Sequence, residues 1–395
     1  MENKLLSRER LDSKQLYSLI FIIMMSVKMF MVPALIIRDA GRDGYMVMSF
    51  YIVIEMLALV VSLIAIKLAK SDICTIFERT YGKILTVTIF LLLAFYYILK
   101  ISLVISEVKM FFLFSASEEF SWEIYILPLL VFLMVAAVKG LNGIGRLAQI
   151  LLPIIAVSIV LLFVLIVSKP DYTNILPVLE NGTGGVMNGI KKYPVWFGDL
   201  PLLCFCCGRV KREKRFILKS MVSVALSSVV VLYFSSVLFF VYAHLSKMVD
   251  YGHNISNMVV YASGNYMFGR FDLLIFCVWL TSVLVQTAYM TCVATELVRY
   301  VFRINAFWAG AGIIVALYIT SNFLFRSEVQ LYNFCMGVPR YFAVLSTVLL
   351  PILTLIASVV SKKGEGDKGK ADFCGQENTI LTAQGGDWAK QGESL

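Results

Sequence analysis

The chain has 395 residues, of which 59% are hydrophobic and only 15% are charged, whereas a soluble domain has about 25% charged residues. This composition excludes an ordinary soluble domain and indicates an all-α integral membrane protein. The net charge of +9 does not indicate nucleic-acid binding, because the basic residues are spread over connections beside apolar segments and no DNA-binding motif surrounds them.

Ten segments are apolar over about the 20 residues that a helix needs to cross a bilayer. The predicted spans are 16–37, 45–66, 84–112, 124–138, 147–168, 185–208, 217–243, 272–298, 306–325 and 341–361. The fourth span is short, and the sixth is interrupted by its own sequence. We therefore expect an N-terminal cytoplasmic segment (1–15), a transmembrane domain (16–361) and a polar, glycine-rich cytoplasmic tail (362–395) that is disordered.

Lys and Arg residues predict the orientation of the chain. If the N-terminus is cytoplasmic, the segments on that side hold 20 Lys and Arg residues and the opposite connections hold 7. Cytoplasmic connections are the ones enriched in Lys and Arg, so both termini are expected in the cytoplasm.

The interruption of the sixth span is the strongest functional signal. Pro194 and Pro201 break the helical hydrogen-bond ladder, and Gly198 and the carboxylate of Asp199 lie between them. Unsatisfied backbone groups cost several kcal/mol against lipid, so this backbone must be sheltered in a protein cavity. A discontinuous helix at mid-membrane is where transporters hold a small solute or ion, so the break predicts a binding site.

Four of the ionisable residues within apolar spans are considered for the site. Lys28 is near the middle of the first span, and Glu55 is at similar depth in the second, so a contact between them is plausible. It is open whether this is only an ion pair that locks two helices or whether Lys28 also has a role in the site. Lys100 is deep in the third span and is a further candidate, whereas Glu107 is interpreted as a solvated helix end.

Other polar and aromatic side chains complete the candidate site. Gln286 and Tyr289, three residues apart, share a helix face and form either an interhelical hydrogen bond or part of the cavity. Aromatic residues beside the break either line the pocket or pack the bundle. The candidate ligand-binding residues are Ser26, Lys28, Tyr97, Lys100, Tyr193, Trp196, Phe197, Gly198, Asp199, Gln286 and Tyr289.

No pattern indicates an enzyme, a metal site or a cofactor. The sequence has no hydrolase elbow, P-loop, HExxH or dinucleotide fingerprint. His244 and His253 have no acidic or cysteine partner at ligand spacing. The eight cysteines are interpreted as packing thiols, with the cluster Cys204, Cys206 and Cys207 as a weak exception for redox or metal chemistry.

Several short motifs, taken in order, resemble a known family. They are Ser13-x-Gln15, Pro33, 40–45, 78–83, Gly143-Ile144-Gly145-Arg146, Pro153, 174–182, Phe197-Gly198-Asp199, Arg270-Phe271-Asp272 and Trp279, and together they extend from residue 12 to about residue 361. Their order is similar to that in the B subunit of spore nutrient-germinant receptors (GerAB type), the endospore germination permeases of the amino acid-polyamine-organocation transporter superfamily.

This resemblance implies a LeuT-like fold, with two inverted repeats of five helices and with helices 1 and 6 broken around a central pocket. It also implies a receptor complex with A and C subunits in the inner membrane of a bacterial spore, where a nutrient such as an amino acid triggers germination. Two alternatives remain: a proton- or sodium-coupled secondary transporter of amino acids or other small metabolites, and a structural scaffold whose pocket is inactive.

Overall fold

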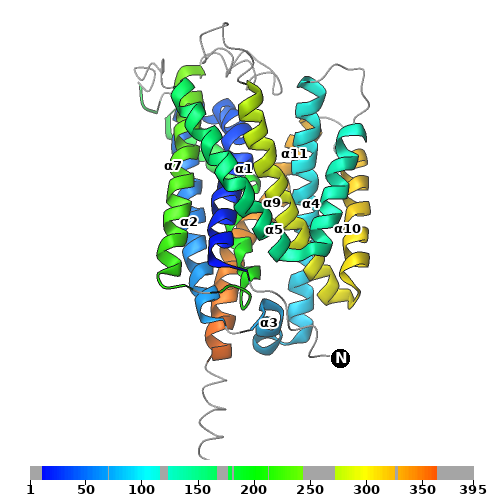
Figure 1. Cartoon of the computed structure of the whole chain (residues 1–395). Coiled ribbons are helices and arrows are strands. Elements are labelled where there is room, and N and C mark those ends of the chain that lie inside the picture. Colours follow the sequence, from blue (N-terminus) through cyan, green and yellow to red (C-terminus); the bar gives the residue numbers. More distant parts are fainter. Residues whose placement is uncertain are drawn as a thin grey trace, which may run out of the picture.

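The computed structural model describes residues 11–69, 71–115, 123–166, 177–179, 182–211, 213–242, 272–324 and 328–362, and this part of the chain is a bundle of helices (Figure 1). The elements in chain order are α1 (Ser13–Ala40), η2 (Gly41–Asp43), α2 (Gly44–Leu68), α3 (Ile73–Tyr81), α4 (Lys83–Ser115), α5 (Glu123–Ile166), α6 (Gly182–Lys192), η4 (Pro194–Trp196), η5 (Leu200–Cys206), α7 (Phe216–Tyr242), α9 (Asp272–Phe302), α10 (Ala306–Ile319), the π-helical turn η6 (Thr320–Leu324), α11 (Glu328–Cys335) and a C-terminal helix, Pro339–Lys362.

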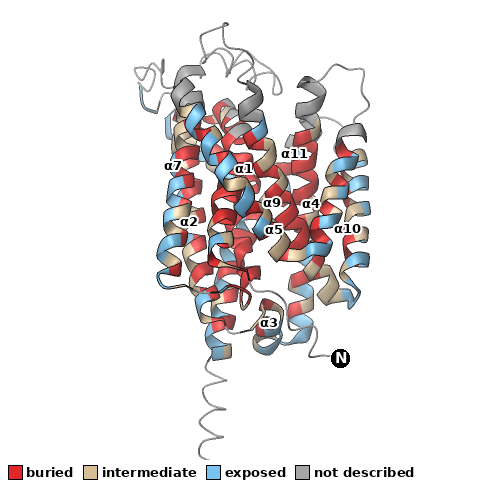
Figure 2. Ribbon diagram, viewed as in Figure 1, coloured by how far each residue is buried: buried red, intermediate tan, exposed pale blue. Residues whose placement is uncertain are grey.

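Helix α1 lies at the centre of the bundle. It begins with a capping box, in which the Asp12 side chain accepts a hydrogen bond from the backbone amide of Gln15 and the Gln15 side chain accepts one from the amide of Asp12 at 3.1 Å. The Asp12 carboxylate also accepts a hydrogen bond from the amide of Ser13 at 3.0 Å. Most of its described side chains are buried, and it packs against α7, α9 and α5 (Figure 2). Polar groups on α1 are therefore sheltered from lipid.

The break expected in helix 1 is absent. Helix α1 is one continuous helix from Ser13 to Ala40, even though it contains Pro33. Two features of the sequence account for this. A glycine would favour unwinding, and this helix contains none. The polar atoms at its centre belong to the side chains of Ser26 and Lys28. The polar groups of helix 1 therefore come from side chains on an intact helix.

The spans agree with the ten expected from the sequence. Seven of the described helices are long and apolar enough to cross a membrane. One of them, α5, contains two predicted spans joined at a kink where Gly140 has a φ of 73°. Counting α5 twice and adding the 28-residue α1 and the broken sixth helix gives ten.

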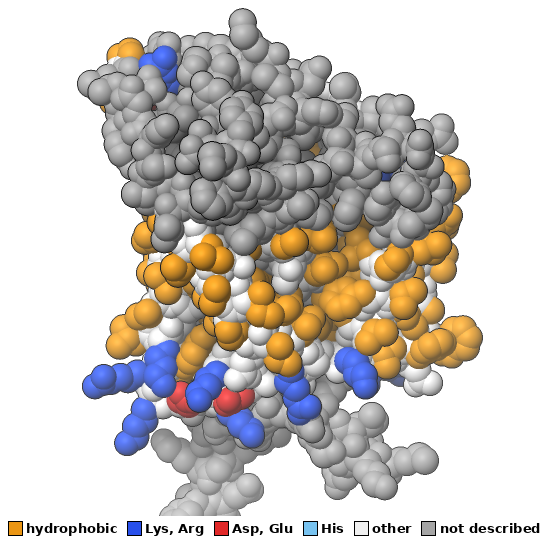
Figure 3. Space-filling view, turned by 45° about the horizontal axis from the view of Figure 1, so that its top comes forward, with side chains coloured by type: hydrophobic (Ala, Val, Ile, Leu, Met, Phe, Trp, Pro, Cys, Tyr) orange, Lys and Arg blue, Asp and Glu red, His pale blue; other side chains and the backbone are white. Residues whose placement is uncertain are grey.

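The outer surface of the bundle is apolar where lipid would lie. Apolar residues are exposed on α4, α5, α7, α10 and the C-terminal helix, and they form a belt above a row of Lys and Arg side chains (Figure 3). The start of α1 and the end of the C-terminal helix lie at the same end of the bundle (Figure 1). This arrangement is that of a membrane protein, and below we call the end that holds the start of α1 the inner end.

Some sequence-based expectations lie outside the described residues. These are the tail from residue 363 onward, His244, His253, Arg270, Phe271, Cys374 and most of the 174–182 motif.

Candidate functional site

The sixth helix is interrupted as the sequence predicts. Helix α6 ends at Lys192, the single turn η4 follows, and the chain then passes through Phe197, Gly198 and Asp199 before η5 continues as a 3-10 helix. Gly198 has a φ of 82°, in the left-handed region that side chains disfavour. A Cβ atom at Gly198 would also collide with the hydroxyl of Thr347 on the C-terminal helix. Only glycine therefore allows the chain to turn here.

The backbone amides freed by the break are bound by a carboxylate. Glu55 Oε1, from α2, accepts two hydrogen bonds, one from the amide of Gly198 at 2.5 Å and one from the amide of Asp199 at 3.1 Å. Glu55 is completely buried. The freed backbone amides are thus sheltered, as predicted, and the group that binds them is the side chain of Glu55. A ligand would have to compete with Glu55 for these two amides.

Four charged groups meet at the break. Lys28 of α1 lies 2.7 Å from Glu55 and 3.6 Å from Asp199, and Lys100 of α4 lies 2.5 Å from Asp199. Lys100 also donates to the carbonyl of Phe197 at 2.8 Å. We call Lys28, Glu55, Lys100 and Asp199 the central cluster; their side chains are 0–3% exposed. Two ammonium groups face two carboxylates, so the formal charge of the cluster is zero.

Polar side chains on α1 and α9 extend the central cluster. Gln286 donates to Asp199 Oδ2 at 2.7 Å, and the hydroxyl of Ser26 donates to the Gln286 carbonyl. Of the two residues paired by spacing, Gln286 and Tyr289, only Gln286 contacts the cluster. Tyr289 donates to the carbonyl of Leu202 at 2.9 Å and therefore braces η5.

Aromatic side chains hold the break on its outer side. Phe197 stacks on Tyr51 with ring centroids 4.1 Å apart, and the Lys28 ammonium is 5.9 Å from the centroid of Phe197. Trp196 donates to Glu107 on α4 at 2.5 Å. Of the predicted aromatic residues, Phe197 is the one that contacts the central cluster, through its ring and through its carbonyl.

Two predicted tyrosines lie outside these contacts. Tyr193 donates to the carbonyl of Leu35 at 2.7 Å and to Asp39 at 2.5 Å, so it ties the sixth helix to α1. Tyr97 is buried on α4 with its ring centroid 5.2 Å from that of Tyr96. These contacts place Tyr193 and Tyr97 in the packing around the site.

The interpretation of Glu107 as a solvated helix end is wrong. Its side chain is 3% exposed and bonded to Trp196. Hydropathy placed it near the end of the span, but the helix extends to Ser115, which leaves Glu107 two turns inside. Two further residues were not identified from the sequence. Tyr51 has no feature in the sequence that distinguishes it from a core aromatic residue, and Thr347 lies 149 positions from Gly198 with no signal of their contact.

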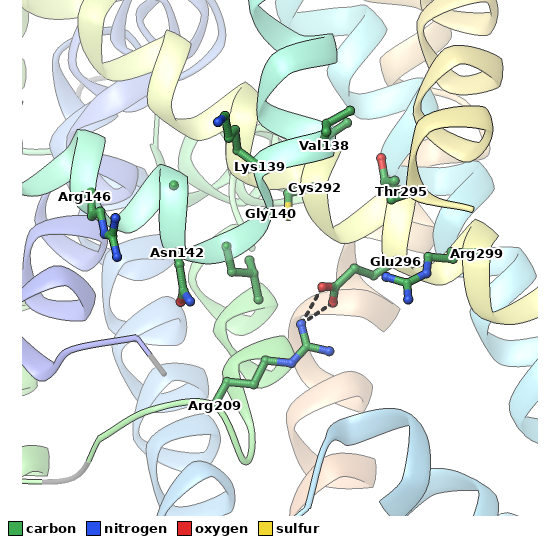
Figure 4. A pocket seen from close by; sticks show the side chains of 14 residues that line it. Val138, Lys139, Gly140, Asn142, Arg146, Arg209, Cys292, Thr295, Glu296 and Arg299 are labelled. Carbon is green, nitrogen blue, oxygen red and sulfur yellow. Dashed lines mark hydrogen bonds and ion pairs between the residues drawn. The ribbon is translucent and has the colours of Figure 1, made fainter. Parts of the chain in front are cut away.

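A second set of charges lies near the inner end of the bundle. Arg209, just after η5, donates to Glu296 of α9 at 2.5 and 2.6 Å and to Asp72 at 3.2 Å. Burial lowers the pKa of Arg209, but the two carboxylates more than offset this effect, so its pKa is raised. We call Arg209, Glu296 and Asp72 the inner cluster. Arg209 and Glu296 line a cavity of about 400 Å³ together with Lys139, Arg146 and Arg299 (Figure 4).

The N-terminal segment is bound beside the inner cluster. The amide of Leu11 donates to the carbonyl of Arg209 at 2.8 Å, and the amide of Lys211 donates to the carbonyl of Leu11 at 2.9 Å. Two backbone hydrogen bonds therefore join the segment before α1 to the segment after η5 at this end of the bundle.

Two solved structures were found similar to this chain. The crystal structure of MhsT in complex with L-phenylalanine matches with a TM-score of 0.60 and 14% identity, covering 89% of this chain and 99% of that chain. The structure of Mhp1, a nucleobase-cation-symport-1 family transporter in a closed conformation with bromovinylhydantoin bound, matches with a TM-score of 0.49 and 13% identity, covering 90% and 92%. The chain therefore shares its fold with MhsT, and the predicted LeuT-like fold is confirmed.

The sequence family is also shown. The family model described as spore germination protein (spore permease) matches residues 10–330, so the chain belongs to the spore germination protein family. The comparison with curated protein sequences gave no match. The resemblance seen in the ordered motifs is therefore confirmed at the level of the family.

Proposed function

We propose that this protein is the germinant-sensing subunit of a spore germination receptor. A small nutrient such as an amino acid binds between α1, α4, the broken sixth helix and α9. The chain works with A and C subunits in the inner membrane of a bacterial spore, with both of its termini in the cytoplasm. It binds its ligand without chemical conversion.

The observation that carries the proposal is the central cluster in a chain of the spore germination family. Buried charges inside a membrane are costly and mark functional sites by default. Here two ammonium groups and two carboxylates cancel around freed backbone amides. A neutral or zwitterionic solute can take the place of the ammonium and carboxylate contacts within the central cluster. This exchange leaves no net charge in the low-dielectric interior.

The same contacts suggest how binding becomes a signal. Glu55 and Lys100 hold the break through backbone atoms of Gly198, Asp199 and Phe197. A ligand whose carboxylate or ammonium group takes over one of these contacts favours a different position of the broken helix. That shift in population is then transmitted to the partner subunits.

A germination assay tests the proposal in spores that contain the A and C subunits. Lys28→Met removes one charge of the central cluster, and Lys219→Met is the matched control, because Lys219 pairs with Glu213 at 2.8 Å with its side chain 52% exposed. With both variants present at normal levels, we expect Lys28→Met alone to lose the response to nutrients. An unchanged response of Lys28→Met to every amino acid, sugar and nucleoside would contradict the proposal, because the charge of Lys28 would then have no role in sensing.

A second candidate is a proton- or sodium-coupled secondary transporter, which the likeness of the fold to MhsT supports. Counterflow in reconstituted vesicles separates the two functions. Exchange of a labelled solute by the isolated chain favours transport, whereas a nutrient response that requires the A and C subunits favours sensing.

A further inference from the structure

Glu107 differs from the other buried carboxylates near the break. Its side chain is 3% exposed, and Oε1 accepts from Trp196 Nε1 at 2.5 Å. The other oxygen, Oε2, is buried without a hydrogen-bond partner. Glu55 and Asp199, in contrast, each face a lysine ammonium at 2.7 and 2.5 Å.

The charges around Glu107 do not neutralise it. Among the described residues, no ion pair involves Glu107. Lys100 lies seven residues earlier on α4, about 10 Å along the helix, and its ammonium is bound to Asp199 and to the Phe197 carbonyl. Asp199, in the break, carries the same charge as an ionised Glu107, and the group facing it from α11 is the Cys335 thiol. The described parts of α5, α9 and α10 contribute no ion pair to it.

We propose that Glu107 is a proton-binding site, in which the carboxylate takes up one proton from water to form the carboxylic acid and releases it in the reverse step. An uncompensated carboxylate costs several kcal/mol in a medium of low dielectric constant, and a group in that position neutralises itself. Protonation places a hydrogen on Oε2, the oxygen that lacks a partner, and leaves Oε1 free to accept from Trp196.

The proton on Glu107 is coupled to the break through Trp196. Trp196 ends η4, the turn directly before Phe197, and Tyr193 before it is bound to α1. A hydrogen bond to a carboxylate is roughly twice as strong as one to a neutral acceptor. Loss of the proton therefore holds η4 more firmly against α4, and uptake of the proton loosens it. This coupling goes beyond the proposed function, since it depends on neither the identity of a ligand nor the partner subunits.

Infrared spectroscopy of the purified full-length protein in nanodiscs tests the proposal directly. We expect the carbonyl band of a protonated carboxylic acid at neutral pH, reversible loss of this band in alkaline buffer, and its absence in Glu107→Gln. Glu78→Gln is the matched control, because Glu78 also accepts from an aromatic side chain, Tyr300 at 2.9 Å, but is exposed. A band that is unchanged in Glu107→Gln, or missing from the unsubstituted protein, would overturn the proposal.

Trp196→Phe provides a second readout if Glu107→Gln does not fold. This variant removes the one hydrogen bond that stabilises the ionised form, so the band should shift in frequency and its loss should require more alkaline buffer. An identical band and an identical titration in Trp196→Phe would contradict the proposal.

Discussion

The central cluster and the inner cluster use the same chemistry in different surroundings. In both, cations and carboxylates from separate helices hold the broken sixth helix, at its middle through Lys28 and Lys100 and just after η5 through Arg209. The side chains of the central cluster are 0–3% exposed, whereas those of Arg209, Glu296 and Asp72 are 10%, 15% and 35% exposed. Water screens the inner charges, so a lost partner there is partly replaced by solvent. The middle of the helix is therefore the less tolerant of the two points of attachment.

The largest effect is expected at Gly198, because the central cluster forms only if the chain can turn there. Gly198→Ala places a side chain on left-handed backbone, which should cost about 1–3 kcal/mol of stability. The added methyl group also collides with Thr347, which should cost about 1–3 kcal/mol more. It also displaces the two amides from Glu55. We expect little folded protein by size-exclusion chromatography in detergent. Gly184→Ala, which meets open space, should behave as the unsubstituted chain, and a folded Gly198→Ala protein would show that the turn is not required.

Removal of a single charge from the central cluster should come next. Lys28→Met leaves Glu55 without its cation and should cost about 3–5 kcal/mol of unfolding free energy. Glu55→Gln in the same chain keeps the carbonyl that accepts from Gly198 and restores neutrality, so the double variant should regain most of the loss. Thermal unfolding in detergent measures both variants. Equal destabilisation by the single and double variants would mean that charge balance does not hold the site together.

A substitution in the inner cluster should lower the stability less than one in the central cluster, and the size of this loss should depend on salt. Arg209→Lys loses the forked contact with Glu296 and Asp72, and charged hydrogen bonds of this kind contribute about 1.5–3 kcal/mol. Thermal unfolding at low and high salt should show a difference between Arg209→Lys and the unsubstituted chain that shrinks as salt screens the inner charges. The loss in Lys28→Met should stay constant. The reverse pattern would contradict the contrast between the two clusters.

The smallest effect is expected for the aromatic support of the break. Tyr51→Phe keeps the stack on Phe197 and removes only the hydrogen bond from the Tyr51 hydroxyl to the carbonyl of Ile190. We expect a loss of about 1 kcal/mol in thermal unfolding. Tyr51→Leu, which also removes the stack, should lose more, and equal losses would show that the stack contributes nothing.

Much of this arrangement could be predicted from the sequence, and the reason is the cost of polar groups in lipid. Pro194, Gly198, Asp199 and Pro201 occur together within eight residues, a combination that interrupts a membrane span and requires shelter, and Lys28 requires a partner such as Glu55 at its own depth. These are local constraints. The contacts that were missed depend on how distant helices pack.

Thr347 meets Gly198 and Trp196 meets Glu107 across 149 and 89 positions of sequence, and hydropathy has no information about such pairs. Helix 1 was expected to be broken because of the family resemblance, but its residues favour an intact helix. The composition of a helix was therefore the better guide to its own backbone, and the family resemblance was the better guide to the whole fold.

The central claim is that a small solute binds at the break by exchanging partners with the central cluster. It is tested most directly by thermal stabilisation of the purified protein, with its A and C subunits, across a panel of L-amino acids, sugars and nucleosides. The Lys28→Met and Glu55→Gln double variant is measured in parallel. We predict that at least one neutral or zwitterionic solute stabilises the unsubstituted protein and fails to stabilise the folded double variant. Equal stabilisation of both proteins, or of neither by any solute, would contradict the account.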